Sequence, residues 1–374
     1  MKYRVLTVGD PAPWVSFPTP STALARIDLL AGRYIVLCFL GSSTSPDALA
    51  TLGALHRRRA LFDDVKASFF GVTCDPADVA RLKDSLPGIR FGLDITREAG
   101  VHFGAVSPED NGANGKVIIR PLWFVLDPTL RVIRVEPFGS DPVQAANSVL
   151  DYLQALPPPR LHAGFPVEAP VLVLPNVFEP QFCQKLTNYF ETHRASPSGF
   201  MDEVEGKTIL REDPAFKSRS DVSIADEALR AEAQRRVQRR VVPEIWKVHQ
   251  FEVTRMERYL IACYRADERG RFIAHRDNST KGTQHRRFAV SIMLNDGFEG
   301  GELHFPEYGS RPFDVPAGCA VVFSCSLMHE VKPLTKGNRY AFLPFLYDES
   351  AAALRESNNA FLGDGMKKYD PDRE

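Results

Sequence analysis

The sequence has no long hydrophobic run, and this absence excludes one class of protein. The longest purely apolar stretch is Tyr34–Leu40, far short of the roughly 20 residues that a membrane-spanning helix needs. The N-terminus has no apolar segment before Gly9 and Asp10, so it does not resemble a secretory signal. We therefore expect a cytoplasmic protein that does not act at a membrane.

Clustered cysteines and an excess of one charge are missing too. The six cysteines are widely spaced and form no C-x-x-C pair, so we expect reduced, mostly buried thiols and no disulfide scaffold. The 46 Lys and Arg residues nearly balance the 47 Asp and Glu residues, which leaves a formal net charge of -1. Such a chain has no overall field to attract a polyanion, so nucleic acid is not an expected partner.

What the chain does have is the length and composition of a folded protein with more than one domain. Its 374 residues are 44% hydrophobic and 25% charged, which is typical of globular proteins. The run Pro157–Pro159 cannot continue a helix or a strand ladder. We therefore predict an N-terminal domain over residues 1–156 and a C-terminal domain over residues 157–374.

The N-terminal part alternates strand-like and helix-like segments. Strands are predicted at Tyr34–Leu40 and Ser68–Thr73, a hairpin at Leu122–Leu126 and Arg131–Val135, and helices at Pro46–Phe62, Pro76–Leu86 and Asp141–Leu156. Strands that alternate with helices favour an α/β sheet.

The C-terminal part has a different texture. Short apolar or alternating runs are separated by Gly, Pro, Asn and Asp, and one long helical segment starts at Ala225 and should end or kink at Pro243. This pattern predicts a mostly β domain with a supporting helix. The polar chain after Asp348 is expected to be a mobile tail, with a lid as the alternative.

A candidate metal site stands out in this second part. In a strand, residues i and i+2 point to the same face, so His275 and Asp277 can offer an imidazole and a carboxylate to one ion. His329, after another strand-like run, would complete the two-histidine, one-carboxylate set of non-haem Fe(II) oxygenases. The alternative is that all three are ordinary polar residues of strands.

Arg339 adds a second chemical element to this set. It follows His329 by ten residues and lies on what should be the adjoining strand. A guanidinium can hold a carboxylate through two parallel hydrogen bonds, more directionally than a lysine can. The pattern therefore indicates iron together with a dicarboxylic cosubstrate.

Five ordered motifs make this region resemble the Fe(II)/2-oxoglutarate-dependent dioxygenases of the prolyl 4-hydroxylase type. They are Leu260–Tyr264, Gly270–Asn278, Ser291–Asn295, Glu299–Leu303 and His329–Tyr340. The resemblance covers roughly Val171–Tyr347. It implies a double-stranded β-helix, or jelly-roll, with supporting helices outside.

The resemblance also assigns roles to residues. It makes His275, Asp277 and His329 the iron ligands and Arg339 the partner of the distal carboxylate of 2-oxoglutarate. Tyr264 matches a pocket tyrosine that faces the cosubstrate or the substrate, although a tyrosine of the core would look the same in sequence.

Two further positions bear on binding. By its position, Arg286 matches an arginine that contacts the peptide substrate in the hypoxia-sensing prolyl hydroxylases. Met293 departs from the pattern of the hypoxia-sensing prolyl hydroxylases, the members of this family that the region resembles most. Those enzymes have a tyrosine there that also holds the distal carboxylate of 2-oxoglutarate, and a thioether cannot donate the hydrogen bond that the tyrosine hydroxyl gives.

The implied function is hydroxylation of peptidyl proline or a related protein side chain, coupled to decarboxylation of 2-oxoglutarate. Fe(II), 2-oxoglutarate and O2 are the implied cofactors and cosubstrates, with ascorbate as an accessory reductant. One alternative is the same chemistry on a free amino acid or a small metabolite. Another is a non-enzymatic binding or sensor module.

The N-terminal part resembles the peroxiredoxins, which have a thioredoxin fold, over Val8–Leu156. The matching segments are Val8–Pro13, Gly32–Leu37 and Phe69–Asp75. The position of the peroxidatic cysteine falls on Ala48, which has no sulfur to oxidise. The resemblance thus implies an inactive redoxin domain that serves as a scaffold, as a surface for homodimer formation or as a docking module.

Overall fold

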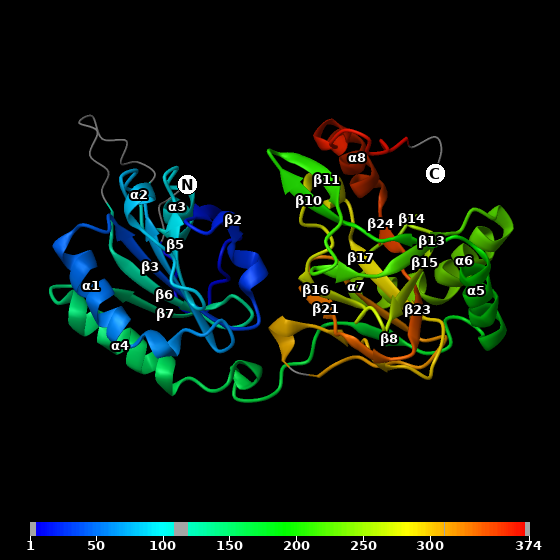
Figure 1. Ribbon diagram of the computed structural model, residues 1–374, viewed down its shortest axis with the longest axis horizontal. Coiled ribbons are helices and arrows are strands. Elements are labelled where there is room, and N and C mark those ends of the chain that lie inside the picture. The colour runs from blue at the N-terminus through cyan, green and yellow to red at the C-terminus, as the bar shows by residue number, and fades with distance from the viewer. Residues whose placement is uncertain (1–4, 108–118, 310, 371–374) are drawn as a thin grey trace. The chain divides into compact units, whose positions relative to one another are not determined.

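The computed structural model describes residues 5–107, 119–309 and 311–370 (Figure 1). Within these ranges, the helices are all too short or too polar to cross a bilayer. The chain forms two compact units. The first contains the chain up to Glu168 together with Pro306–Gly309, and the second contains the remainder from Ala169 onward. The domain boundary predicted after Leu156 stays a prediction.

The first unit is an α/β structure. Its described strands are β1 Ser16–Thr19, β2 Thr22–Arg26, β3 Tyr34–Gly41, β4 Ala67–Thr73, β5 Ile89–Leu93, β6 Leu122–Leu126 and β7 Val132–Pro137. Its described α-helices are α1 Pro46–Arg57, α2 Asp78–Arg81, α3 Glu98–Phe103 and α4 Pro142–Ala155. Short 3-10 turns lie at η1 Ile27–Leu30, η2 Arg59–Leu61 and η3 Pro159–Leu161.

One mixed sheet forms the centre of this unit. Its order is β5-β4-β3-β6-β7, with β3, β4 and β5 parallel and with β6 and β7 antiparallel to their neighbours. Figure 1 shows α1 and α4 side by side, and both pack on the sheet face that carries Val36, Phe69 and Trp123. The thioredoxin-like α/β fold expected from the sequence is confirmed.

Most predicted elements of this unit form, and their ends are set by local caps. The Ser45 hydroxyl accepts a hydrogen bond from the Ala48 N–H at the start of α1, and the Asp141 carboxylate caps α4 in the same way. The helix predicted over Pro76–Leu86 is wrong beyond Arg81. There the Asp84 carboxylate accepts hydrogen bonds from the N–H groups of Phe91 and Ser21, at 2.9 and 3.1 Å, which holds the chain in an extended path.

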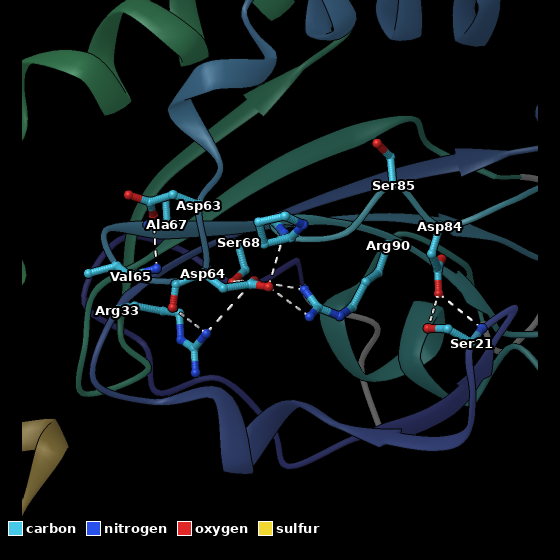
Figure 2. A network of polar contacts seen from close by, with 12 residues as sticks. Ser21, Arg33, Asp63, Asp64, Val65, Ala67, Ser68, Asp84, Ser85 and Arg90 are labelled. Carbon is cyan, nitrogen blue, oxygen red and sulfur yellow. Dashed lines mark hydrogen bonds and ion pairs between the residues drawn. The ribbon is translucent and has the colours of Figure 1, made fainter.

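A polar network closes one edge of the sheet (Figure 2). The Asp64 carboxylate accepts two hydrogen bonds of 2.8 Å from the Arg90 guanidinium and one of 2.6 Å from Ser68, and Arg33 lies 3.7 Å away. Burial alone would raise the pKa of Asp64, but these bonds hold it well below its usual value. Both arginines thus have a carboxylate partner within the fold.

The second unit is mostly β. Its described strands are β8 Leu172–Leu174, β9 Ser196–Pro197, β10 Phe200–Val204, β11 Lys207–Arg211, β12 Lys217–Ser218, β13 Ser220–Ser223, β14 Arg255–Glu257, β15 Leu260–Arg265, β16 Arg271–His275, β17 Phe288–Met293, β18 Glu299–Gly300, β19 Leu303–His304, β20 Ala320–Ser324, β21 His329–Val331, β22 Leu334–Lys336, β23 Asn338–Phe342 and β24 Phe345–Tyr347. Its described helices are α5 Pro180–Thr192, α6 Glu227–Arg240, α7 Val242–His249 and α8 Glu349–Ser357, with 3-10 turns η4 Lys281–Thr283 and η6 Asn358–Phe361. The 3-10 turn η5 Pro306–Tyr308 belongs to the first unit.

Two sheets carry the site described below. The larger runs β14-β24-β17-β23-β15-β13-β9, with β20 joining β17 to β8, and the smaller runs β12-β16-β21-β19. They meet through side chains such as Phe323 of β20, whose ring lies 4.6 Å from that of His329 on β21. The double-stranded β-helix fold expected from the sequence is confirmed, and the long helix from Ala225 appears as α6 followed by α7.

The larger sheet has an outer face covered by helices and an inner face. Ile261 and Cys263 of β15, and Tyr340 and Phe342 of β23, belong to the core that these strands share with α5, α6 and α7. Because side chains alternate along a strand, Tyr264 and Arg339 point to the inner face. Met293 of β17 points the same way, since Ile292 belongs to the outer core.

The described chain after Asp348, which ends at Asp370, is bound to the rest of the second unit. The Asp348 carboxylate caps α8 through the Ala351 N–H, and the Gly363 N–H donates to the Thr208 carbonyl at 2.8 Å. The Asn358 amide donates to the carbonyl of Lys281 at 2.7 Å. The expected mobile tail is therefore wrong for the described part of this segment, because backbone groups of β11 and η4 bind it, and the expectation for residues 371–374 lies outside the described residues.

Candidate metal centre

Strands β16 and β21 place two histidines opposite each other. His275 pairs with His329 in the antiparallel register, and their ring centroids are 4.3 Å apart. Directly opposite residues of antiparallel strands project to the same face. The two imidazoles therefore share one face of the smaller sheet.

Asp277 completes the group, although not in the way that the sequence predicted. Strand β16 ends at His275, and Asp277 lies in the turn that follows, where its N–H donates to the Cys325 carbonyl at 3.0 Å. One carboxylate oxygen lies 3.6 Å from His275 Nε2 and the other 3.4 Å from His329 Nε2. The turn, and not strand alternation, brings Asp277 to the histidines.

Among the described residues, these three are the one set of His, Cys, Asp and Glu whose ligand atoms could hold a metal ion, all within 4.8 Å of one another. Each histidine keeps its Nε2 directed at the group, because Nδ1 lies near a backbone carbonyl, that of Ile273 at 2.8 Å or that of Leu327 at 3.1 Å. Such bonds fix the ring orientation and the tautomer of metal-binding histidines.

The protonation states also suit a metal. Burial lowers the pKa of His329 to about 4, so its imidazole is neutral at neutral pH. Burial by itself would raise the pKa of Asp277, but the adjacent His329 and His275 rings hold it well below its usual value. A neutral imidazole and an ionised carboxylate are the forms that coordinate a cation.

Arg339 lies buried on the inner face of the larger sheet. Only 2% of it is exposed, and it sits opposite Tyr264 in the β15–β23 register, with its guanidinium 5.2 Å from the centre of the Tyr264 ring. No carboxylate of a described residue lies within 4 Å of it. A buried charge without a partner is costly, so the position of Arg339 fits a residue whose charge a bound anionic ligand would compensate.

Gly301 explains part of the motif Glu299–Leu303. It has a φ of +72°, and a Cβ built there would lie 2.9 Å from the Arg339 Cδ and 2.8 Å from a Leu334 methyl carbon. Any larger residue would therefore press on the arginine stem. A glycine at this position lets the arginine lie close to the backbone.

The other predicted binding residues lie nearby in this unit. Met293 shares the inner face with Arg339, and it provides no hydroxyl there. The Arg286 side chain is mostly buried, donates to Glu257 at 2.7 Å and also approaches the Asp277 carbonyl at 3.4 Å. A substrate contact by Arg286 stays a prediction, because its guanidinium is already engaged.

The sequence did not single out Lys217 and Arg219, which the structure also brings to this region. The Arg219 guanidinium pairs with Asp221 at 2.7 Å and lies 5.7 Å from the centre of the Tyr264 ring. In the segment Lys217–Asp221, charged residues alternate with serines. This alternation could have indicated a strand with a charged face, but such short polar runs occur in many exposed strands.

Comparison with known proteins adds a separate observation. Residues 259–347 match the family model of the 2OG-Fe(II) oxygenase superfamily. The resemblance of this region to that superfamily is confirmed. We call residues 259–347 the oxygenase region and the set His275, Asp277 and His329 the metal group. The oxygenase region contains the whole metal group as well as Tyr264 and Arg339.

The relatives match over part of their length. A PKHD-type hydroxylase of Pseudomonas putida strain F1 is 32% identical over 114 residues, which are 27% of this chain and 50% of that protein. The chain therefore spans about half the length of that curated relative. A prolyl hydroxylase from Trichoplax adhaerens, solved with a hypoxia-inducible factor peptide, covers 49% of this chain and 86% of its own at 19% identity and a TM-score of 0.40.

The first unit has structural neighbours of another kind. Peroxidoxin BcpB from Mycobacterium tuberculosis covers 40% of this chain and 97% of its own, at 21% identity and a TM-score of 0.34. In this chain Ala48 is fully buried in α1. Burial also raises the pKa of Cys38 and of Cys74, which is the opposite of the shift that activates a thiol.

Proposed function

We propose that this protein is an Fe(II)- and 2-oxoglutarate-dependent dioxygenase. The observation that carries the proposal is the buried Arg339, without a carboxylate partner among the described residues, in the same unit as the group formed by His275, Asp277 and His329. The match of the oxygenase region to the 2OG-Fe(II) oxygenase superfamily supports it.

The residues present fit this metal and this cosubstrate. Two imidazoles and one carboxylate on one side of an ion are the ligand set of non-haem Fe(II) oxygenases, and they leave other positions open. When bound, iron would supply the O2 chemistry that couples decarboxylation of 2-oxoglutarate to hydroxylation. Arg339 would bind the distal carboxylate in a bidentate pair.

The surrounding residues orient these groups and limit the access of water. The His275 ring stacks on Phe272 at 3.5 Å, and the His329 ring meets Phe323 edge-on at 4.6 Å. The Tyr264 ring lies within 5.7 Å of the Arg219 guanidinium and 5.2 Å of the Arg339 guanidinium, contacts that help to hold it on the inner face. A dry, rigid surround strengthens electrostatic binding of a dicarboxylate.

For the substrate we propose peptidyl proline or a related protein side chain. The names of the curated relatives, PKHD-type hydroxylases, support this class. A free amino acid or a small metabolite is the second candidate, because the metal group and Arg339 would serve it equally. Ascorbate as an accessory reductant stays a prediction.

The test of this function is succinate formation. Full-length protein is incubated in air with Fe(II) and labelled 2-oxoglutarate, with and without proline-containing peptides, beside a His275→Ala control. We expect succinate from the wild type, increased by a productive peptide, and only background from the variant. Equal amounts from both proteins would contradict the proposal and favour a binding or sensor module.

For the N-terminal part, we propose a redoxin-like domain over residues 1–156 without peroxidase activity, followed by the oxygenase domain over residues 157–374. Its role would be that of a scaffold, a docking module or a homodimer surface. Full-length protein should consume hydrogen peroxide with dithiothreitol no faster than a Cys38→Ser, Cys74→Ser double variant. Analytical ultracentrifugation measures whether the chain forms dimers.

A further inference from the structure

A second buried cation lies beside the metal group. Strand β12 pairs with β16 so that Lys217 stands opposite Phe272, and the Phe272 ring stacks on that of His275. The register of β16 is irregular between Phe272 and His275, which puts both on one face despite their odd spacing. Lys217 therefore shares the face of the smaller sheet that presents the metal group.

The contacts of the Lys217 ammonium leave its charge uncompensated. It donates one hydrogen bond of 2.6 Å to the Gly199 carbonyl and lies 4.7 Å from the centre of the Phe272 ring. The residue is 6% exposed, and no carboxylate oxygen of a described residue lies within 4 Å. An ammonium has three donors, so this group can bind more than it does within the fold.

The charged groups around Lys217 do not compensate its positive charge. Arg219 and Arg258 repel its charge, while Asp221 and Asp277 attract it from beyond direct contact. Asp221 is already paired with Arg219, and Asp277 belongs to the metal group. Burial is the largest cause that lowers the pKa of Lys217 well below its usual value, and repulsion by the two arginines adds to it. An anion bound beside the ammonium would raise this pKa again.

We propose that Lys217 binds a carboxylate of the substrate that this enzyme hydroxylates. The proposal rests on the proposed function and narrows its substrate class to molecules with an acidic group near the reacting carbon. That carboxylate could be the α-carboxylate of a free amino acid or an acidic side chain beside a proline. Lys217 and Arg339 lie on different sheets, so the substrate and the cosubstrate have separate cationic partners.

The experiment compares matched carboxylate and amide probes. Binding to full-length protein is measured calorimetrically with Fe(II) and 2-oxoglutarate under argon, so that no turnover occurs. One pair is L-proline and L-prolinamide, and the other is N-acetyl-Pro-Asp-amide and N-acetyl-Pro-Asn-amide. In at least one pair, we expect the wild type to bind the carboxylate at least about tenfold more tightly than the amide. The pair that shows this preference identifies the source of the carboxylate.

The variant Lys217→Met should reduce this preference to less than about threefold, and Lys217→Arg should keep most of it, since a charged partner in a buried site contributes strongly. Lys247→Met, which removes an exposed lysine of α7, should leave it unchanged. A wild type without preference, or a Lys217→Met protein that keeps it, would overturn the proposal. A purely structural role through Gly199 would lower the thermal unfolding temperature without altering the preference.

Two further measurements separate the possible failures. The affinity for 2-oxoglutarate alone should be the same in wild type and Lys217→Met, and a tenfold loss would assign the lysine to the cosubstrate instead. Succinate formation by the same wild-type preparation tests the proposed function independently. Succinate without any carboxylate preference refutes only the role of Lys217, whereas a preference without succinate refutes only the oxygenase activity.

Discussion

Two cations of the second unit, Arg339 and Lys217, differ from two arginines of the first unit in whether a carboxylate lies beside them. In the first unit, Arg33 and Arg90 both lie against the Asp64 carboxylate, so their charges are neutralised within the fold (Figure 2). In the second, Arg339 and Lys217 are more deeply buried, and no carboxylate of a described residue lies within 4 Å of either. Removing one partner of a buried ion pair is costly because it leaves a charge uncompensated, and a bound carboxylate would compensate the charge of Arg339 or Lys217.

The same contrast appears in the turns that hold reactive groups. The turn before α1 places Ser45 as a helix cap and Ala48 in the core, and nothing there can react as a thiol. The turn after β16 places Asp277 beside two histidines. The first unit has its fold without a thiol at this position, while the second brings together the two imidazoles and the carboxylate of the candidate metal site.

The largest effect should come from removing a member of the metal group. Asp277→Ala takes away the carboxylate that lies beside both imidazoles, so we expect succinate formation to fall at least about a hundredfold, beyond the range for residues that merely support a ligand. Iron binding measured by equilibrium dialysis should weaken in parallel. His304→Ala, whose ring pairs with Glu330, is the matched control, and an equal loss there would show a general effect on the fold.

The next effect sharpens the comparison of the buried arginines. Arg339→Met should raise the KM for 2-oxoglutarate at least about thirtyfold, because loss of a buried charged partner costs about 2–5 kcal/mol. Arg90→Met in the first unit should leave this KM unchanged and lower stability instead. If both variants changed the KM equally, the distinction between paired and unpaired arginines would not hold.

Asp64→Asn should destabilise the first unit by roughly 2 kcal/mol, a value below that of a fully buried pair because the carboxylate is partly exposed. Urea unfolding followed by tryptophan fluorescence in a Trp246→Phe background reports on this unit, where the other two tryptophans lie. The activity of the second unit should be retained. A change in activity without a change in the urea midpoint would contradict the assigned role.

The smallest effect is a pH dependence. The pKa of Asp64 is lower in the folded state than the ordinary value of about 3.9, so below about pH 4 the unfolded chain binds more protons than the folded one. The contribution of Asp64 is thus present above pH 4 and is lost as the pH falls. The difference in urea midpoint between pH 6 and pH 3 should be smaller in Asp64→Asn than in wild type, and an unchanged difference would argue against this carboxylate as its source.

Much of the framework could be predicted from local sequence. Helix starts at Ser45 and Asp141 follow from short side chains that cap the next turn, and the strand runs of the first unit follow from their apolar residues. The candidate metal residues were recognisable because their order and spacing match a motif. These inferences need only neighbours in the chain or a known family pattern of residue types.

Other features depended on contacts between distant segments. The path of Asp84 is set by Phe91 and Ser21, and the segment after Asp348 is held by Thr208 and Lys281. Asp277 reaches the histidines through a turn held by Cys325, not through strand alternation.

The sequence by itself determined which chemical groups are available: two histidines, an aspartate and an arginine in a family-like order, and an alanine at the position of the thiol. Only the tertiary structure decided which charges are paired. Whether an arginine or lysine meets a carboxylate depends on strand register and burial across segments far apart in the chain, and residue spacing along the chain determines neither.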